Sequence, residues 1–435
     1  MKKHNETSTN KSISRRTLLK GSAAALGAVA ATSLGGFPTL WAQDIKDIEI
    51  RMLGSAVTHQ KPWEEMAIAA TGLNIQQTVV DFGTILQRIA TQPRGWDIAE
   101  PAYQQLPAFW PMGNARPIDT RRVKHWDKVI GLYKAPGKIW DDASYGQGMN
   151  PSLSNYTSTE DGRDFAAPES TPWLTLLPGN HNADTLGARP DIIGRPIESW
   201  AEFINPEFSG RVGLQNYPDI GLMDIALAME AAEMITYSNK GDMTREEIDF
   251  TFNFMVDLKK KGHFRAFWTT FMESVNFMLS GETVIQSMWS PAVTVVKSNG
   301  VPCVYLDLKE GYRSWTIGSV LSKHVEDGKK LDAIYDLFAW YYSGPSGAYF
   351  ARQGYYMPTP DLTKKYLDPY EWDFWYEGKA ATEDINNPFG QKLEMAGAVR
   401  DGGSWKNRMG RVAVWNSTMK ENAYVIKRWN EFLTA

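Results

Sequence analysis

The sequence predicts an α/β fold with a largely parallel sheet, and two observations support this prediction. Short segments rich in β-branched and apolar residues alternate along the chain with segments of helical periodicity. Hydrophobic residues make up 43% of the 435 residues, which is typical of a globular protein with enough length for about two domains. Beyond the N-terminal leader no stretch offers about 18 consecutive apolar residues, so we expect no transmembrane span.

The N-terminal part of the chain shows this alternation most regularly. Its first helix has Pro62 in the first turn and Gly72 just past the end, where these residue types are favoured. Residues 141–172 are rich in Asp, Ser, Gly, Asn and Pro and are expected to form a long loop or insertion. The other elements expected here are strands over residues 48–53 and 97–99, a β-rich segment over 74–80, a helix over 62–70 and an amphipathic segment over 84–90.

The C-terminal part of the chain continues the pattern. Thr244 and Glu247 form a capping box, so a helix is expected to begin there and to end at Lys261. Ser290 and Pro291 suit the N-cap and the first residue of a further helix. The elements expected here are strands over residues 173–177, 284–287 and 301–306 and helices over residues 244–261, 290–299 and 331–342.

Residues 1–42 are predicted to be a twin-arginine signal peptide. Arg15 and Arg16 follow a polar, basic leader and precede a weakly apolar stretch that is rich in Ala and Gly. Cleavage is expected near Ala42, although Leu40 is not the small residue usually found at that distance from the cut. We therefore expect the twin-arginine translocase to export the chain and the mature protein to be periplasmic.

Removal of this leader makes the protein strongly acidic. The leader carries six Lys or Arg residues and one Glu, so the net charge of −4 for the whole chain becomes −9 for the mature protein. Phosphate binding requires a basic surface. The sequence therefore indicates no nucleic-acid partner.

Metal and cofactor sites are not indicated by the sequence. Cys303 is the single cysteine, which excludes an internal disulfide and any multi-cysteine metal or iron–sulfur site. The six histidines are scattered, without a His-x-x-His or HExxH pattern. We expect no metal and no cofactor.

Linear catalytic motifs are not found in the sequence either. The chain has no Gly-x-Ser-x-Gly elbow, no phosphate-binding Gly-x-x-x-x-Gly-Lys-Ser/Thr loop and no Gly-x-Gly-x-x-Gly after a strand. We therefore expect no catalytic residues and no enzyme. An exported cofactor-dependent enzyme stays open as an alternative, because twin-arginine export moves folded proteins, often with a cofactor already inserted.

Several segments, taken in order, resemble one branch of a known family. They are Trp96-Asp97-Ile98, Asn182 to Gly187, Pro196 to Phe203, Pro206 to Val212, Leu279 to Glu282, Trp315 and Gly354 to Thr359. Their order and spacing over about residues 45–365 resemble the polyamine (spermidine/putrescine) type of periplasmic ABC-transporter solute-binding proteins.

The resemblance implies a fold, a function and a domain division. The fold is the two-lobed periplasmic-binding-protein fold of type 2, with a ligand cleft between the lobes and a hinge that the chain crosses more than once. We expect residues 43–178 in lobe one, 179–310 in lobe two, and 311–435 as the completion of lobe one with C-terminal helices. The strands of residues 48–100 and of residues 196–300 are accordingly expected in separate sheets.

The implied function is the capture of a small ligand and its delivery to an ABC-transporter permease in the inner membrane. A ligand-sensing partner of a receptor, built on the same fold, is a further alternative.

Four candidate ligand-binding residues follow predicted strand ends, where ligands bind in open α/β sheets. Trp289 precedes a capped helix, and Tyr103 follows the strand of residues 97–99. Tyr217 and Asp219 also precede a helix, and the favoured role of Asp219 is to cap that helix, with ligand contact as the alternative. For each aromatic residue the alternative role is packing in the core.

The remaining candidates come from the segments that carry the resemblance. Trp315 and Tyr355 are expected to face the cleft, and Asn182 and Asp184 to supply polar contacts. A local turn bond is the alternative role of Asp184.

The type of ligand is left open by the sequence. Aromatic and acidic residues in a net-negative protein favour a cationic amine. However, relatives that bind polyamines have an Asp one or two residues after the counterpart of Trp315, and no acid follows Trp315 here as far as Ser319. Spermidine or putrescine, a quaternary amine, an amino acid derivative and a small carboxylate all remain candidates.

Overall fold

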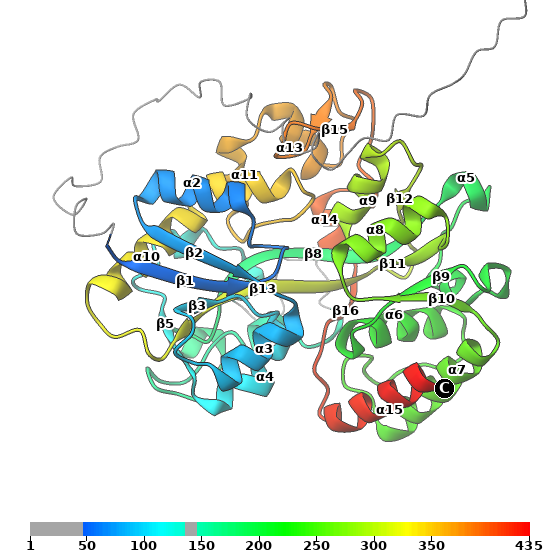
Figure 1. Cartoon of the computed structure of the whole chain (residues 1–435), viewed down its shortest axis with the longest axis horizontal. Helices are drawn as coiled ribbons and strands as arrows, with labels where there is room; N and C mark the ends of the chain where they lie inside the picture. Colours follow the sequence, from blue (N-terminus) through cyan, green and yellow to red (C-terminus); the bar gives the residue numbers. More distant parts are fainter. Residues whose placement is uncertain (1–46, 135–145) are drawn as a thin grey trace, which may run out of the picture. The chain divides into compact units, whose positions relative to one another are not determined.

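The computed structural model describes residues 47–134 and 146–435 (Figure 1). The predicted signal peptide therefore lies outside the described residues. Within them, twelve strands are joined into one sheet whose main path runs in the order β10-β9-β11-β8-β13-β3-β1-β2. These strands are β1 (Glu49–Gly54), β2 (Asn74–Val79), β3 (Ile98–Ala99), β8 (Leu177–Ala188), β9 (Val212–Gln215), β10 (Phe264–Trp268), β11 (Ile285–Met288) and β13 (Tyr312–Ser322).

Shorter strands extend this path at its edges. β12 (Val304–Tyr305) pairs with β8, β4 (Ala115–Arg116) and β16 (Val412–Trp415) pair with β13, and β6 (Gln147–Gly148) pairs with β16. Two small two-stranded sheets stand apart: β5 (Ile118–Asp119) with β7 (Trp173–Leu174), and β14 (Ile385–Asn386) with β15 (Lys392–Glu394).

The sheet is mixed rather than largely parallel as predicted. β1 runs parallel to β2 and β3, and β9 runs parallel to β10 and β11. β8 and β13 are antiparallel to each other, and each is also antiparallel to its outer neighbour, β11 or β3. Two parallel groups are thus joined through an antiparallel centre. We call the strands β1, β2 and β3 the β1 side of the sheet and β9, β10 and β11 the β9 side.

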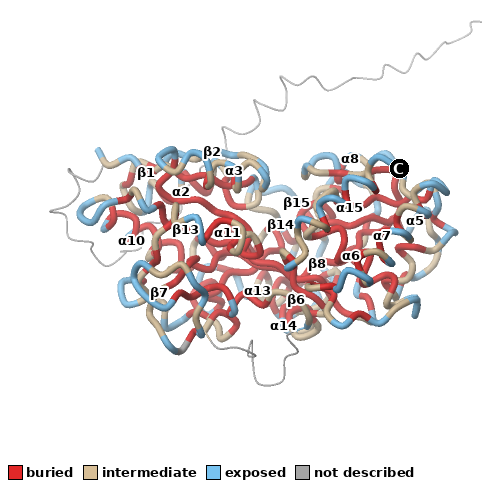
Figure 2. Tube along the Cα trace, turned by 90° about the horizontal axis from the view of Figure 1, so that it is seen from below, coloured by how far each residue is buried: buried red, intermediate tan, exposed pale blue. Residues whose placement is uncertain are grey.

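β8 and β13 join the two sides because each strand pairs with more than one neighbouring strand along its length. The first part of β8 pairs with β13, and its last four residues, Thr185 to Ala188, pair with β11. Val320 and Leu321, near the end of β13, pair with β3. Both strands are buried throughout (Figure 2).

The sequence did not predict β8 as a strand. Its residues include Pro, Gly, Asn and Asp, which are depleted in strands. Burial between two neighbouring strands overrides this weak local preference, because pairing satisfies the backbone groups of a segment that has no access to water.

The expected separation into two sheets is not met, because the ladder is continuous through β8 and β13. No strand of the β1 side pairs directly with a strand of the β9 side. The lobe boundaries near residues 178 and 310 stay a prediction, and the two crossing strands begin beside them.

Helices pack against both groups of strands, the β1 side and the β9 side (Figure 1). On the β1 side these are α2 (Lys61–Thr71), α3 (Phe82–Thr91), α4 (Leu106–Phe109), α10 (Lys329–Tyr342) and α11 (Pro345–Ala351). On the β9 side these are α6 (Pro218–Ala231), α7 (Arg245–Lys260), α8 (Phe271–Ser280), α9 (Ser290–Ser298) and α15 (Asn422–Thr434). The remaining short helices are α5 (Pro190–Ile193), α12 (Pro360–Thr363), α13 (Pro369–Trp375) and α14 (Trp405–Gly410).

Local sequence signals predicted several of these helices. Gly72 ends α2 with a left-handed φ of 72°, and both hydrogen bonds of the predicted capping box between Thr244 and Glu247 open α7. The last helix, α15, packs on the β9 side of the sheet. Trp429 of α15 packs edge-on against Phe252 of α7, at a ring distance of 6.3 Å, in the hydrophobic cluster of the β9 side.

Two further expectations concern single features. Cys303 is buried just before β12, as expected of a small apolar residue, and burial raises the pKa of its thiol to about 12. Among the described residues, no helix combines the length and the apolar character needed to cross a membrane.

The close approach of β8 and β13 predicts the effect of one substitution. A Cβ at Gly318 of β13 would overlap the carbonyl oxygen of Leu177 and the side chain of Leu176. Gly318→Ala should therefore force the strands apart and lower the free energy of unfolding by about 1–3 kcal/mol, measured by urea denaturation. As a control, Gly83→Ala in α3 meets only the Asp81 side chain, at 3.1 Å, and should lower the free energy of unfolding by no more than about 0.5 kcal/mol. Equal stability of the two variants would contradict this account of the crossing.

Candidate ligand-binding site

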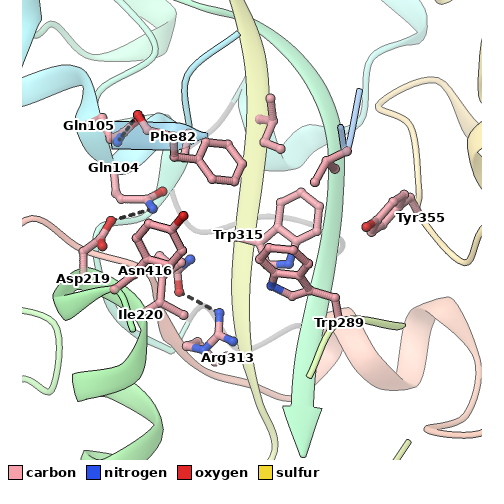
Figure 3. Close-up of a pocket in the computed structure, with 14 residues that line it drawn as sticks. Phe82, Gln104, Gln105, Asp219, Ile220, Trp289, Arg313, Trp315, Tyr355 and Asn416 are labelled. Carbon is pink, nitrogen blue, oxygen red and sulfur yellow. Dashed lines mark hydrogen bonds between the residues drawn. The ribbon is translucent and has the colours of Figure 1, made fainter. Parts of the chain in front are cut away.

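An inner cavity lies against the crossing strands (Figure 3). Its atom-free volume is about 520 Å³, part of which is its open mouth. Arg313, Trp315 and Ile317 of β13 all line it. Because alternate residues of a strand point to the same face, one face of β13 forms the floor of the cavity.

The walls of the inner cavity come from both sides of the sheet. The β1 side contributes residues that follow β1 and β3 or begin α3, namely Val57, Phe82, Ala102, Gln104 and Gln105. The β9 side contributes residues that follow β9 and β11, namely Tyr217, Asp219, Ile220 and Trp289. Tyr355 and Asn416 complete the lining. The carboxyl ends of parallel strands therefore meet at this cavity, where a ligand is expected in an α/β sheet.

Five of the predicted ligand-binding residues line the inner cavity. They are Tyr217, Asp219, Trp289, Trp315 and Tyr355. Their contact with a ligand stays a prediction, and the structure places them where such contact can occur.

Three predicted residues do not line the inner cavity. The Tyr103 hydroxyl donates a hydrogen bond to the carbonyl oxygen of Asn416 at 2.6 Å, and its ring packs edge-on against Trp415, so Tyr103 has the alternative role of core packing. Asn182 and Asp184 lie buried inside β8 rather than in a loop. Asp184 therefore has no turn bond either.

Asp184 does not line the inner cavity, but it fixes the position of the Trp315 ring that does. Its carboxylate accepts hydrogen bonds from Trp315 Nε1 at 2.7 Å and from the Tyr305 hydroxyl at 2.8 Å. Burial raises the pKa of Asp184 to about 6, although Arg313 lies 3.7 Å away and opposes the shift. Asp184 is thus a positioning residue for the indole ring in the cavity.

Arg313 is a cavity residue that sequence reasoning missed. Its Nε donates to Asp224 at 2.6 Å and its Nη1 donates to Asn416 at 3.0 Å. Its Nη2 has no hydrogen-bond partner among the described residues. Arg313 stands two residues before Trp315, so recognising β13 as a strand would have placed both on the same face.

Gln104 and Asp219 meet at one edge of the cavity (Figure 3). Gln104 Nε2 donates to Asp219 Oδ2 at 3.0 Å, which joins the β1 side to the β9 side. Asp219 lies in the first turn of α6, and Tyr217 occupies the N-cap position, so the capping role favoured for Asp219 is wrong. Burial raises the pKa of the Asp219 carboxyl.

The aromatic rings of the cavity are packed in pairs. Trp289 meets Trp268 edge-on at 5.0 Å and lies parallel to Phe271 at 6.4 Å. Trp315 meets Tyr355 edge-on at 5.5 Å. Trp289 and Trp315 are only 9% and 7% exposed, so these rings both line the cavity and support the fold.

A larger outer cavity lies beside the inner one, with an atom-free volume of about 1400 Å³ that includes its open mouth. The two cavities are neighbours, because they share the lining residues Val57, Phe82, Tyr217, Trp289 and Tyr355. In the part of the chain that the structure describes, no group of three or more His, Cys, Asp or Glu residues could hold a metal ion.

Comparisons with known proteins identify the fold. Residues 68–373 match the family described as bacterial extracellular solute-binding protein. Among solved structures, a putative spermidine/putrescine ABC transporter from Listeria monocytogenes has a TM-score of 0.61 at 10% identity, with 89% of this chain and 99% of that chain covered.

Two further structures are similar to the same extent. An ABC transporter substrate-binding protein from Bradyrhizobium japonicum has a TM-score of 0.59 at 13% identity, covering 89% of this chain and all of that one. The PBP AgtB from A. tumefaciens R10, in complex with agropinic acid, has a TM-score of 0.56 at 13% identity, covering 89% and 99%. No curated protein matches the chain significantly by sequence. The predicted α/β periplasmic-binding-protein fold is confirmed.

The environment of Asp184 predicts a pH dependence of stability. Because its pKa is raised to about 6 in the folded protein, the ionised form is disfavoured there, and the free energy of unfolding should fall as pH rises from about 4 to about 6. Asp184→Asn removes this titration and should reduce the fall by up to about 3 kcal/mol, measured by urea denaturation at a series of pH values.

The matched control for this experiment is Asp361→Asn. Asp361 is exposed in α12, so its replacement should leave the pH profile of the parent unchanged. Parallel profiles for the parent protein and Asp184→Asn would contradict the proposed ionisation behaviour.

Proposed function

The chain belongs to the family of bacterial extracellular solute-binding proteins, and on that premise we propose that it captures a small ligand in the inner cavity and delivers it to an ABC importer. The partners are then a small polar metabolite and a permease in the inner membrane. We further propose that the protein is not an enzyme, in keeping with the transport role of the family and of the similar structures.

The observation that carries this proposal is a cavity walled from both sides of the sheet. Ligand pockets are concave and mostly apolar, with a few polar groups that fix orientation. Arg313 and Asp219 are such groups, and aromatic rings surround them. A ligand that contacts both walls would favour a closed arrangement of two lobes, with β8 and β13 as the hinge.

Amine-type ligands and amino acid derivatives are the first candidates. The similar structures include one named for spermidine and putrescine and one bound to agropinic acid. The cavity is consistent with either class, since it combines a carboxylate, a guanidinium and aromatic faces.

Ligand capture can be tested by thermal-shift screening of the purified protein against amines, amino acids and organic acids. A ligand present at about 100 times its dissociation constant should stabilise the protein by about 2.7 kcal/mol. Trp289→Phe should weaken binding of that ligand by about fivefold through the loss of aromatic contact area, whereas Trp372→Phe, in a helix outside the cavity, should not change it. If no compound stabilises the protein, or if Trp289→Phe binds the ligand unchanged, the inner cavity is not the site.

We also propose a periplasmic location, reached through the twin-arginine translocase. Replacing both Arg15 and Arg16 with Lys should block export, because the translocase recognises the guanidinium pair rather than positive charge alone. Cell fractionation and immunoblotting measure the outcome. A normal periplasmic level of the double Lys variant would show that the leader is not of the twin-arginine type.

A further inference from the structure

We propose that the ligand is a zwitterion with an apolar body, and this inference rests on the proposed function. The inner cavity binds an ammonium group and a carboxylate together. The outer cavity takes an aromatic or branched aliphatic body that is attached to them. The ligand class is therefore that of apolar amino acids and their close derivatives, rather than linear polyamines.

The inner cavity offers acceptors for an ammonium group. Gln104 Nε2 donates to Asp219, and Gln105 Nε2 donates to the carbonyl oxygen of Phe82, so both amides are held in one orientation. The Oε1 atoms of both glutamines then have no donor among the described residues. Together with the Asp219 carboxylate, they form a set of oxygens that can receive N–H groups.

The same cavity offers a donor for a carboxylate. Arg313 is 1% exposed, and its Nη2 has no hydrogen-bond partner among the described residues. Asp184 lies 3.7 Å away, beyond hydrogen-bond distance, while Nε and Nη1 are engaged by Asp224 and Asn416. One guanidinium nitrogen therefore remains available to a ligand oxygen.

A ligand with a single charge would leave part of this set unpaired. An amine alone provides no acceptor for Arg313, and a carboxylate alone provides no donor for Gln104 and Gln105. A buried polar group that loses water without gaining a partner costs free energy. The ammonium group of a zwitterion donates to the glutamine and Asp219 oxygens, and its carboxylate accepts from Arg313.

The polar side chains around the outer cavity already have partners within the protein. Asp81 accepts hydrogen bonds from the backbone N–H and hydroxyl of Thr84 as the N-cap of α3. Lys61 pairs with Glu64, and Arg352 pairs with Glu371. The outer cavity therefore offers apolar surface rather than free charge.

Two exposed apolar side chains mark the wall of the outer cavity. Phe389, in the turn between β14 and β15, is 56% exposed, and Val79 at the end of β2 is 51% exposed. They line the same cavity as Phe82 and Phe271, and Phe82 also lines the inner cavity. An apolar body placed there would remove these side chains from water.

A linear polyamine fits this arrangement poorly. Among the described residues that line the outer cavity, Asp81 is the only carboxylate, and it already caps α3. The second ammonium of putrescine or spermidine would therefore enter an apolar space without a free acid.

The test is calorimetric titration of the purified protein with a matched set of compounds. Phenylalanine, in both enantiomers, has both charges and an aromatic body. Phenethylamine lacks the carboxylate, phenylpropionate lacks the ammonium, and alanine lacks the aromatic body. Spermidine represents the polyamines. Homologues of phenylalanine with a longer spacing between the ammonium and the carboxylate are titrated as well. Weak binding of phenylalanine caused only by the wrong spacing is then recognised as such.

The zwitterion with an aromatic body should bind at least about tenfold more tightly than each of the three truncated compounds and than spermidine. Phe389→Ser should weaken its binding by about threefold to tenfold while leaving alanine unaffected. Met395→Ser, which removes a 68% exposed side chain outside both cavities, is the matched control and should have no effect.

The outcomes separate this inference from the proposed function. Binding of spermidine, or of a truncated compound, as tightly as phenylalanine and its homologues overturns the inference and leaves solute capture intact. Binding of hydrophilic compounds alone in a wider metabolite screen also overturns the inference and leaves solute capture intact. If no metabolite binds at all, the proposed function itself fails.

Discussion

The buried crossing of β8 and β13 is the constraint on which the rest of this structure depends. Both strands are enclosed along their whole length, so only groups inside the protein or a bound ligand can pair with the polar side chains on them. Arg313 pairs with Asp224 and Asn416, while its Nη2 lies 3.7 Å from Asp184 and makes no hydrogen bond with the described residues. The packing that joins the two sides of the sheet therefore also sets a fixed charge at the floor of the site.

The carboxyl groups around Arg313 are held in position by the protein itself, without a ligand. Burial raises the pKa of Asp184, Asp219 and Asp224, while Arg313 favours their ionised forms. Asp184 also fixes the Trp315 ring through its indole N–H. Side chains held in this way lose little further freedom on binding, which favours affinity and specificity.

Local sequence signals predicted α2, α7 and the strand end that precedes Trp289, because caps, turns and periodicity act within a few residues. They did not predict β8, whose Pro, Gly and Asn residues become strand only through burial between neighbours. β13 was not predicted as a strand either, which removed Arg313 from the candidate site. Without β8, a local turn bond was the alternative role given to Asp184. The role of Asp184 depends on contacts across 121 and 131 residues of sequence, which no local pattern records.

The central claim is that a small ligand binds between the two sides of the sheet, over β13. A crystal structure of the protein with its tightest ligand tests this most directly. The account predicts ligand density in the inner cavity, within hydrogen-bond distance of Arg313 Nη2 and of Asp219 or Gln104. Ligand density on an outer surface, with the inner cavity filled only by water, would contradict it.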